Sequence, residues 1–393
     1  MNREELVRMA RRNIEHAKDG TVDQAPGIHR VPSAHYVDRE RWEREMERIF
    51  GRLPLVLGFS AELREPGQYR SIVFGDVPVL LVRGRDGAVR AFLNACVHRG
   101  SMLVEEGAGE SSRFVCPYHA WAYDDEGALL GIYKQKDFGE LDKSCHGLTR
   151  LPVHERAGII WGALRPDCPV DLDRFLAGYD ALLEALGLAE THLVGRQVVQ
   201  GPGWKVAYDG YLDLYHLPIL HKDSFGPDFP NDALYDAYGP HQRVSGPNPA
   251  LVALEEKAEG DWPIEAMIPG VWTIFPHISI ADFDAGGKLY MVSQLVPGDS
   301  PGSSRTIQNF LAVDPPTPES QAAVDEMMKF LMGVVRDEDY ATGLQIQRTL
   351  GTGLAGDVLF GRNEWGGQRF HQWVDRLLET DDADLDALFE KGL

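Results

Sequence analysis

Two short segments that each pair a cysteine with a histidine constrain this chain more than any other feature of its sequence. The first is Cys96-Val97-His98, and the second, which begins after a gap of 17 residues, is Cys116-Pro117-Tyr118-His119. Thiolate and imidazole alternate, so the two cysteines can serve one metal ion and the two histidines another. A [2Fe-2S] centre with imidazoles on one iron needs that arrangement. Zinc is the alternative, but zinc fingers place both cysteines before both histidines.

The chain around these segments has the pattern of a small β-rich module. Between Leu53 and about Val153, runs such as YRSIVF and VPVLLV combine β-branched and aromatic residues, and turn signals stand at Asp86-Gly87 and Glu126-Gly127. Such runs, bounded by glycine turns, predict antiparallel strands and hairpins. We therefore expect an all-β module of roughly 100 residues that carries both Cys-His segments.

Helical and strand patterns occur outside this module. Residues 2–18 and 38–50 have charged faces and apolar residues three and four positions apart, which predicts helices. Residues 270–313 alternate between apolar and polar positions and predict strands of a larger sheet, while Thr317-Pro318-Glu319 has the composition of a helix start. The segment 225–249 is rich in Pro, Gly, Asp and Asn and is expected to be a long loop.

The composition bounds the size and the surroundings of the protein. With 393 residues, of which 44% are apolar, the chain can form two domains with separate cores. Its 39 basic and 60 acidic residues give a formal net charge of -21, which disfavours nucleic acid as a partner. No apolar run reaches the roughly 18 residues that span a bilayer. Only four cysteines occur, which is typical of the cytoplasm, and Cys145 and Cys168, which lack ligand spacing, are expected to be buried.

A second group of residues with metal-binding chemistry follows further along the chain. If this region is helical, Asp209, Asp213 and His216 lie at i, i+4 and i+7, on one face. His221 lies five residues after His216, but Pro218 predicts a helix break that would let the second imidazole turn back to the same metal. Two histidines and one carboxylate make the facial triad of a non-haem Fe(II) site, with positions left for O2 and substrate.

The third ligand has to come from elsewhere, and the sequence offers Asp337, Glu338 and Asp339. Apolar residues at helical spacing predict a buried helix face just before them, formed by Val324, Met327, Met328, Leu331, Val334 and Val335. Asp337 projects to the opposite side, as in a solvated helix end, whereas Glu338 lies on the buried face and Asp339 at its edge. A carboxylate on a buried face is costly unless it is paired or bound to a metal. We therefore expect Glu338 or Asp339 to be a ligand.

The two Cys-His segments resemble those of the Rieske [2Fe-2S] domain. Cys96-x-His98-Arg99-Gly100 and Cys116-Pro117-Tyr118-His119-x-Trp121 match its two cluster loops, and the resemblance covers about residues 45–155. Ala120 stands where glycine is common, which keeps the position small. The resemblance implies that four residues hold the cluster: Cys96, His98, Cys116 and His119.

The later segments resemble the catalytic domain of the Rieske non-haem iron oxygenases. The resemblance rests on Trp204-Lys205, on Asp213-x-Tyr215-His216-x4-His221, and on Glu338-Asp339 with Gln347 eight residues beyond Asp339. It implies that His216, His221 and Asp339 bind a mononuclear iron. It also implies that Asp213 hydrogen-bonds both His216 and His119 of the partner subunit. Many members that act on aromatic rings have Glu-Asn where this chain has Tyr208-Asp209, which leaves the role of Asp209 open.

The resemblance implies an α+β protein of three parts. Residues 1–44 are an N-terminal helical segment that packs with the catalytic domain, residues 45–155 are the all-β Rieske [2Fe-2S] domain, and residues 156–393 are the catalytic mononuclear iron domain. The last is expected to have a helix-grip fold, as in START-like domains, with a central antiparallel sheet. In this family the cluster is too far from the iron of its own chain, so electrons cross between subunits. A cyclic homotrimer is therefore expected, with or without a beta subunit.

The function implied is that of an alpha subunit, the terminal oxygenase of a multicomponent system. Residues 351–356 fit the dinucleotide-binding pattern G-x-G-x-x-G, but they follow a predicted helix and not a strand, and the chain has no other flavin or nicotinamide fingerprint. Electrons from NAD(P)H are therefore expected to arrive through a ferredoxin or a flavin reductase. We expect O2-dependent hydroxylation of an aromatic compound, by monooxygenation or cis-dihydroxylation, in an apolar pocket near Trp272, Phe275 and Phe283. Oxidative O- or N-demethylation uses the same centres and stays open. A zinc-stabilised ligand-binding module without catalysis is the alternative from another class.

Overall fold

The computed structural model describes residues 1–228 and 231–393, which fall into two compact units. The large unit combines Met1–Ile49 with Val170–Leu393, and the small unit consists of Phe50–Pro169. The small unit thus begins and ends later than the limits of 45 and 155 that the sequence suggests. The pairing of strands explains the difference, because the last hairpin of the small unit completes a sheet with its first strand.

The small unit contains three antiparallel sheets. The largest has five strands in the spatial order β10 (Arg150–Leu151), β5 (Val89–Leu93), β4 (Val77–Arg83), β3 (Gln68–Phe74) and β6 (Gly107–Glu110). A second sheet has the order β11 (Val153–Arg156), β12 (Ile159–Gly162) and β2 (Leu55–Phe59). The third has the order β7 (Arg113–Val115), β8 (Ala122–Asp124) and β9 (Leu129–Gly131), and the short helix α4 (Gln135–Phe138) follows it. The predicted all-β module is confirmed.

The core of the small unit includes the two cysteines of the Cys-His segments. Leu80, Val82 and Phe92 of β4 and β5 belong to one buried cluster with Cys96 and Cys116. Burial of this apolar surface is the main force that holds the strands together. The loops that carry the cysteines are therefore fixed to the most stable part of the unit.

The large unit is organised around a seven-stranded antiparallel sheet. Its spatial order is β13 (His192–Gly201), β19 (Ser304–Ala312), β18 (Lys288–Pro297), β17 (Ile278–Asp284), β16 (Val271–Ile274), β15 (His241–Ser245) and β14 (Leu234–Tyr238). The pairing of β17 with β18 runs without a break from Ile278 opposite Gln294 to Asp284 opposite Lys288. The strands predicted within residues 270–313 are confirmed as β16 to β19.

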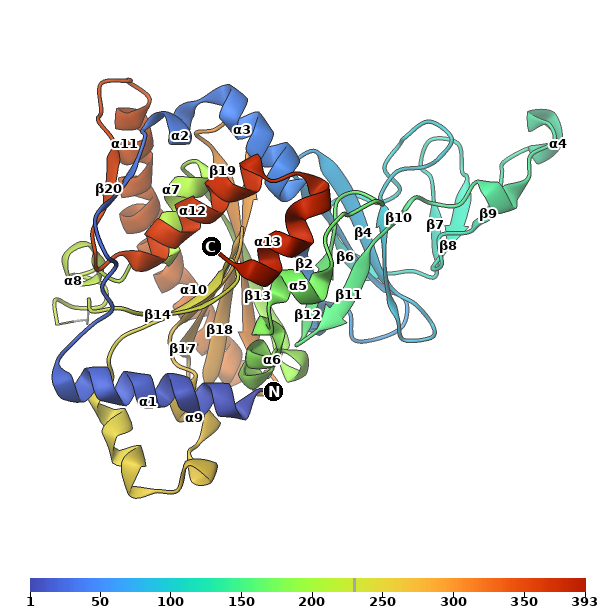
Figure 1. Ribbon diagram of the computed structural model, residues 1–393. Helices are drawn as coiled ribbons and strands as arrows, with labels where there is room; N and C mark the ends of the chain where they lie inside the picture. Colours follow the sequence, from blue (N-terminus) through green and yellow to red (C-terminus); the bar gives the residue numbers. More distant parts are fainter. Residues whose placement is uncertain (229–230) are drawn as a thin grey trace. The chain divides into compact units, whose positions relative to one another are not determined.

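Helices surround this sheet, as Figure 1 shows for α7, α10, α11 and α12. The helices of the large unit are α1 (Arg3–Asp19), α2 (Ala34–Val37), α3 (Arg39–Glu45), α5 (Leu172–Leu176), α6 (Tyr179–Leu183), α7 (Trp204–Tyr211), α8 (Leu217–Leu220), α9 (Ile264–Met267), α10 (Pro318–Gly333), α11 (Ala341–Leu350), α12 (Trp365–Glu379) and α13 (Leu385–Lys391). Helix α10 packs on β13, and α7 packs on β18. The sheet therefore supports the helices that carry the candidate ligands.

Helix α10 begins where the sequence predicts. The hydroxyl of Thr317, the N-cap residue, accepts a hydrogen bond from the Ser320 N–H at 3.2 Å, and Pro318 occupies the first helical position. Val324 and Leu331 of the predicted apolar face belong to one buried cluster with residues of the sheet. The predicted start and buried face of this helix are both confirmed.

Residues 225–249 do not form the long loop that their composition suggests. Strands β14 and β15 lie in this segment and pair across a two-residue turn, Gly239-Pro240, in which Gly239 has a φ of +55°. Gln242 and Arg243 are buried in β15, so the strand lacks the apolar alternation by which strands are recognised. The loop prediction was wrong for these strands, and residues 229–230 lie outside the described residues.

The N-terminal segment is bound into the large unit at two places. Strand β1 (His29–Val31) pairs with β20 (Val358–Phe360). Glu45, at the end of α3, is fully buried, forms ion pairs with Lys205 and with Arg41, and accepts a hydrogen bond from the Trp204 Nε1 at 3.0 Å. A buried charge is tolerated only when it is paired in this way. The Trp204-Lys205 segment therefore anchors the N-terminal helices.

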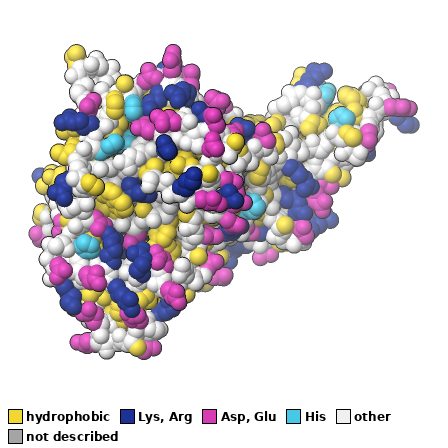
Figure 2. Space-filling model, viewed as in Figure 1, with side chains coloured by type: hydrophobic (Ala, Val, Ile, Leu, Met, Phe, Trp, Pro, Cys, Tyr) yellow, Lys and Arg dark blue, Asp and Glu magenta, His cyan; other side chains and the backbone are white. Residues whose placement is uncertain are grey.

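Charge is unevenly divided between the two units. Residues 50–169 contain 14 Lys and Arg and 15 Asp and Glu, so nearly all of the net charge of -21 belongs to the large unit. Figure 2 shows acidic and basic side chains interspersed over the visible face.

No helix among residues 1–228 and 231–393 is both long and apolar enough to cross a membrane.

Candidate metal centres

Two loops of the small unit present the cysteines and histidines, and the loops share one backbone geometry. In the first loop, the Gly100 N–H donates to the Cys96 carbonyl at 2.8 Å, and the Cys96 N–H donates to the carbonyl of the residue after Gly100, also at 2.8 Å. In the second loop, the Ala120 N–H donates to the Cys116 carbonyl at 2.9 Å, and the Cys116 N–H donates to the Trp121 carbonyl at 2.8 Å. Each loop is thus closed by its own backbone hydrogen bonds, which fixes the direction of its ligand side chains.

Gly100 and Ala120 end the two loops in left-handed backbone conformations, with φ of +76° and +54°. Residues with a β-carbon adopt this region at a cost of roughly 1–2 kcal/mol, whereas glycine adopts it freely. The geometry explains why glycine is common at position 120 in the Rieske domains that this sequence resembles. Ala120 adopts the required conformation with some strain.

The side chains of the two loops meet. Cys96 and Cys116 are 2% and 3% exposed, and the ring centroids of His98 and His119 lie 4.7 Å apart. The His98 ring stacks on Trp121 at 4.9 Å with an interplanar angle of 4°. The Nδ1 atoms of both histidines are inaccessible to solvent and have no hydrogen-bond partner within the described part of the chain. Since buried polar atoms without partners are costly, two thiols and two such nitrogens fit a bound metal cluster.

The surroundings of the sulfur atoms also fit metal binding. Burial opposes ionisation of Cys116, but the N–H groups of His119 and Tyr118 outweigh it and lower the pKa of this thiol below its usual value. The Tyr123 hydroxyl lies 3.2 Å from the Cys96 Sγ. Hydrogen bonds to the sulfur atoms are among the features that set the reduction potential of an iron-sulfur cluster.

The second group of candidate ligands follows α7 and does not lie on it. The helix ends at Tyr211, so the predicted helical face through Asp213 and His216 is wrong. The Asp213 carboxylate accepts a hydrogen bond at 2.5 Å from the backbone N–H two residues later, a local turn that competes with helix formation. The helix does break before His221, but at residues 212–216 and not at Pro218, which lies in the first turn of α8.

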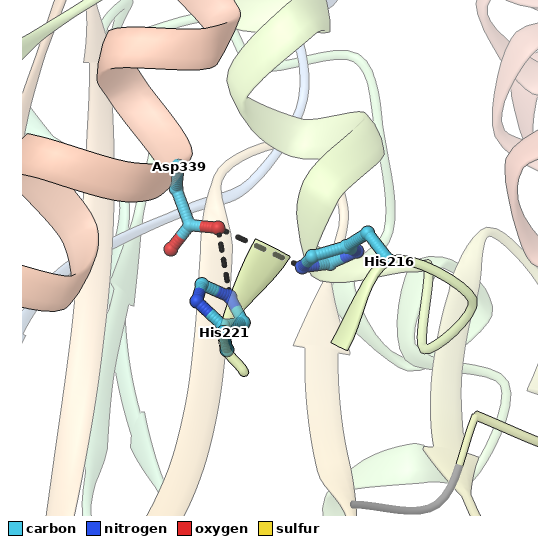
Figure 3. Close-up of side chains that lie close together, drawn as sticks. All are labelled: His216, His221 and Asp339. Atoms are coloured by element: carbon cyan, nitrogen blue, oxygen red, sulfur yellow. Dashed lines mark ion pairs between the residues drawn. The ribbon is translucent and has the colours of Figure 1, made fainter. Parts of the chain in front are cut away.

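His216, His221 and Asp339 nevertheless meet at one point. Each offers a ligand atom, and these atoms lie within 4.8 Å of one another. Figure 3 shows the Asp339 carboxylate facing both rings, with its Oδ1 atom 3.1 Å from the Nε2 of His221 and 3.6 Å from the Nε2 of His216. Asp339 lies on a π-helical segment, Val334–Tyr340, between α10 and α11. Such turns are frequent at functional sites, and the donor set fits Fe(II).

Carboxylates hold both histidines through the opposite ring nitrogen. The Asp213 Oδ2 lies 3.0 Å from the Nδ1 of His216, and the Glu338 Oε2 lies 2.5 Å from the Nδ1 of His221. Each carboxylate keeps a proton on Nδ1, which leaves the lone pair of Nε2 for a metal. Burial opposes protonation of His221, yet Asp339 and Glu338 raise its pKa above the usual value.

The three acidic residues on the π-helical segment have different surroundings. Asp339 faces the histidine pair, and Glu338 contacts the back of His221 and accepts a hydrogen bond from the Ser224 hydroxyl at 2.9 Å. Asp337 has a side chain that is 58% exposed and pairs with Arg336. The predicted solvated position of Asp337 is confirmed. Of the two residues that the sequence leaves open, Asp339 joins the two histidines as a possible ligand, whereas Glu338 contacts the Nδ1 of His221.

A cavity of about 970 Å³ adjoins this group within the large unit. Besides the two histidines and Asp339, its lining includes Phe225, Phe283, Met291, Leu331, Val334 and Ile346. Of the three aromatic residues expected near a pocket, Phe283 lines the cavity. Trp272 pairs with Ile280 and so lies on the opposite face of the sheet from Phe283, and Phe275 is buried beside Phe370. The prediction was wrong for Trp272 and Phe275.

Other residues of the site were missed from the sequence or placed wrongly. Tyr36 and Glu364 line the cavity, but they lie more than 300 residues apart and have no spacing signal.

Cys145 is exposed, contrary to the prediction, and its Sγ lies 3.5 Å from the Asp142 Oδ2. Cys168 is half-buried. Single residues of this kind are identified only by the fold.

Two protein-family models match the chain. The model of the Rieske [2Fe-2S] domain matches residues 54–143, and the model of the ring hydroxylating alpha subunit (catalytic domain) matches residues 201–380. The first range contains both Cys-His loops. The second contains the histidine pair, Asp339 and most of the cavity lining.

Individual relatives agree with these matches. The glycine betaine monooxygenase oxygenase subunit of Chromohalobacter salexigens is 33% identical over 212 residues, which are 53% of this chain and 47% of that protein. The benzene 1,2-dioxygenase subunit alpha of Pseudomonas putida is 33% identical over 196 residues, which are 48% of this chain and 43% of that protein. The chain thus spans about half the length of the curated relatives it matches.

The fold is also similar to that of a solved enzyme. Naphthalene 1,2-dioxygenase from Rhodococcus sp., solved with bound indole, superposes with a TM-score of 0.73 over 97% of this chain and 99% of that one, at 22% identity. Three observations lead to the same family assignment. They are the two closed Cys-His loops, the histidine-carboxylate group beside a cavity, and the two family matches in the same order along the sequence. This chain belongs to the Rieske oxygenases, with a Rieske [2Fe-2S] domain followed by the catalytic domain of the ring-hydroxylating alpha subunits.

Proposed function

We propose that this chain is the terminal oxygenase of a multicomponent enzyme, which receives electrons from a separate ferredoxin or reductase and uses O2 to hydroxylate a small organic molecule. One observation carries the proposal: the same chain contains two different sets of candidate metal ligands, and the second set adjoins a cavity large enough for a substrate. An electron carrier needs only the first set. A zinc-stabilised binding module has no use for the second.

In the small unit, the cluster would be held by Cys96, His98, Cys116 and His119. When bound, a [2Fe-2S] cluster with two imidazole ligands supplies a one-electron centre with a potential of about -150 to +300 mV. The closed loops keep the four ligand atoms in place. Trp121 covers one face of His98, and the buried core around the cysteines keeps water away from their sulfur atoms.

In the large unit, Fe(II) would be held by His216, His221 and Asp339. When bound, it supplies open coordination positions and the oxidising chemistry that a protein side chain lacks. Asp213 and Glu338 orient the two rings by hydrogen bonds to Nδ1. The apolar lining of the cavity excludes water and orients the substrate.

We assign Asp213 as the link between the two centres. In this assignment its carboxylate hydrogen-bonds His216 and also His119 of the partner subunit, so that electrons pass between subunits of a homotrimer. Two features support it: the side chain of Asp213 is 26% exposed, and Tyr215 and Ile219, which follow it, are 58% and 76% exposed. Exposed apolar residues beside a functional group are typical of a surface that a partner covers.

The cavity supports an aromatic substrate. Phe225 and Phe283 offer ring faces, and aliphatic side chains complete an apolar surface around the proposed iron position. The volume of about 970 Å³ is at the upper end of the usual range for ligand pockets, roughly 300–1,000 Å³. A substituted or multi-ring compound would fill it better than benzene does. Mono- and dihydroxylation both agree with these features.

Oxidation beside a quaternary ammonium nitrogen, or oxidative demethylation, is the second candidate. Besides Asp339, the cavity lining includes the carboxylates of Asp209, Asp213, Asp282 and Glu364, and one guanidinium, that of Arg243. Carboxylates and aromatic rings together attract organic cations. One relative that is 33% identical is named a glycine betaine monooxygenase.

The proposed electron donor and the proposed location of the protein in the cell rest on the sequence. The chain lacks a flavin or nicotinamide fingerprint, so a separate protein would pass electrons from NAD(P)H to the cluster. Four cysteines in 393 residues suit the cytoplasm, where thiols stay reduced. We therefore propose a cytoplasmic ferredoxin or flavin reductase as partner.

A substrate panel tests the proposal. The purified, iron-replete protein is combined with NADH and a surrogate reductase and is given benzene, indole or glycine betaine in turn, and ¹⁸O2 uptake and products are followed by mass spectrometry. Visible absorption of the oxidised cluster and an ¹⁸O-labelled product are expected. Product analysis is essential, because oxygen is also consumed in uncoupled turnover. A colourless protein that binds zinc would overturn the proposal.

A further inference from the structure

Three polar side chains from distant parts of the chain meet at the cavity wall. Tyr36 of α2, Asp209 of α7 and His371 of α12 form a closed triangle. The Tyr36 hydroxyl lies 2.8 Å from the Asp209 Oδ2, and the His371 Nε2 lies 2.9 Å from both the Asp209 Oδ1 and the Tyr36 hydroxyl. Tyr36 and His371 are 3% and 1% exposed, while Tyr36 and Asp209 line the cavity.

The hydrogen bonds assign the protons of this triangle. A carboxylate only accepts, so the Tyr36 hydroxyl donates to Oδ2 and an N–H at the Nε2 of His371 donates to Oδ1. The Nδ1 of His371 then carries a lone pair. This atom is buried and has no hydrogen-bond partner among the residues that the structure describes. A proton added there gives an imidazolium that the Asp209 carboxylate stabilises, so the pair can hold one more proton.

Further charged and titratable groups from neighbouring elements interact with this pair, with Tyr36 or with Glu364: His29, His35, Glu45, Lys205, Asp213 and Glu364. Glu364 precedes α12 and lines the same cavity. Burial and the carboxylates of Asp213 and Asp209 raise the pKa of Glu364 above its usual value. The cavity wall beside Asp209 therefore disfavours a further negative charge at Glu364.

We propose that Asp209, reloaded by His371, donates protons into the cavity, an inference that rests on the proposed function. Hydroxylation of R–H by O2 takes up two electrons and two protons and yields R–OH and water, and cis-dihydroxylation takes up the same numbers. The partner protein supplies the electrons. The protons need their own route into a largely apolar cavity, and Asp209 is an acid on its wall with a buried partner behind it.

The proton moves in two steps. His371 takes up a proton from water at Nδ1 and then releases the Nε2 proton to Asp209, so its ring never becomes negative. Loss of the Nδ1 proton and uptake of one at Nε2 then restore the first tautomer, from which the second proton follows. Asp209 releases that proton to the oxygen that is being reduced, while the Tyr36 hydroxyl holds the carboxylate in place. Related chains with asparagine at position 209 would lack this route, because an amide does not carry a titratable proton. His371 and Tyr36 act through Asp209 and are positioning residues.

Asp209→Asn in the holoenzyme tests the proposal, with Asp357→Asn, an exposed aspartate before β20, as the matched control. With a substrate from the panel above, the rate of product formation is expected to fall roughly 100-fold. Added acetate or imidazole should restore part of the rate, and Asp209→Glu should retain more of it than Asp209→Asn. Iron content, cluster spectrum and melting temperature should match those of the control. A normal rate, or a loss that neither the small acids nor Asp209→Glu relieves, overturns the proposal.

A second measurement does not depend on activity. Deuterium exchange at the ring C2–H of His371, followed by mass spectrometry between about pH 5 and 9, reports directly on this ring. The exchange profile should differ between Asp209→Asn and the unmodified protein, because the carboxylate that accepts from Nε2 is lost, and an unchanged profile contradicts the coupling. If the unmodified protein makes no product, the proposed function fails, whereas the exchange experiment still tests the pair.

Discussion

The two candidate metal centres of this chain are built in opposite ways. In the small unit, the four ligands come from two loops between residues 96 and 119, and each loop is closed by its own hydrogen bonds. In the large unit, the ligands come from residues 216–221 and from Asp339, more than 100 residues later, and their positions depend on how α7, α8 and the π-helical segment pack. The first centre is local and the second is not. Damage to the fold should therefore affect the second centre first.

Removal of single ligands is the strongest test of this separation. Cys96→Ala is expected to abolish the visible absorption of the cluster and leave Fe(II) binding by the large unit intact. Asp339→Ala is expected to abolish tight Fe(II) binding and leave the spectrum unchanged, because the two ligand sets lie in different units. Elemental analysis and visible spectra of both variants check this. Loss of both metals from either variant would show that the centres are not independent.

Asp213→Ala is expected to abolish product formation while both metals are retained at saturating Fe(II). The variant lacks the carboxylate that contacts His216 and, in our assignment, His119 of the partner subunit. Metal content and turnover are measured on the same preparation, with Asp232→Ala, an exposed aspartate, as the control. Normal turnover in Asp213→Ala would refute the role of Asp213 as a link.

Glu338→Gln is expected to lower the affinity for Fe(II) by roughly 10–100-fold, the usual effect of losing a carboxylate behind a ligating histidine. The neighbouring Asp337→Asn is a matched control, since Asp337 is exposed and pairs with Arg336. Anaerobic Fe(II) titration of both variants measures the difference. Equal affinities would mean that the contact between Glu338 and His221 does not orient the ring.

Lys205→Met is expected to destabilise the large unit by about 3–5 kcal/mol, because the buried Glu45 carboxylate loses one of its two counter-charges. Lys257→Met, at an exposed lysine, is the control. In urea, loss of the helical signal should move to lower denaturant concentration, while loss of cluster colour should move little. A parallel shift of both signals would mean that the units unfold together.

The smallest expected effect concerns the two loop ends. Gly100→Ala should destabilise the small unit by roughly 1–2 kcal/mol, because it forces a β-carbon into the left-handed region, and Ala120→Gly should stabilise it by less than that. No heavy atom lies within 4 Å of a β-carbon built at Gly100, so the cost is purely conformational. The temperature at which cluster absorption is lost measures the stability of both variants. If this temperature falls in Gly100→Ala and rises in Ala120→Gly, the two loop ends are equivalent.

The sequence was most informative where ligands are close together. The alternation of Cys96, His98, Cys116 and His119 predicted two matching loops, because their spacing is set by a local turn. The break that Pro218 predicts lies earlier in the chain, since α7 ends at Tyr211 and Pro218 stands in the first turn of α8. The helical face through Asp213 and His216 failed, because Asp213 bonds to the backbone after it and ends the helix.

Contacts between distant segments could not be predicted in the same way. The separate surroundings of Glu338 and Asp339 depend on a π-helical turn, which no spacing rule anticipates. Strands β14 and β15 were missed because buried Gln242 and Arg243 replace apolar residues. Tyr36 and His371 meet Asp209 only after three segments have packed together.

The division of the large unit into two stretches of chain has a consequence for its synthesis. Asn13 of α1 donates to the carbonyl of Gly246, 233 residues later, so the first helix emerges long before its partners exist. At about 5–20 residues per second, that interval is on the order of 10–50 s. During this interval the small unit can fold completely, whereas the apolar face of α1 stays exposed until its partners have been synthesised. A nascent-chain chaperone that shields this helix would therefore raise the yield of assembled protein more than one that acts on the small unit.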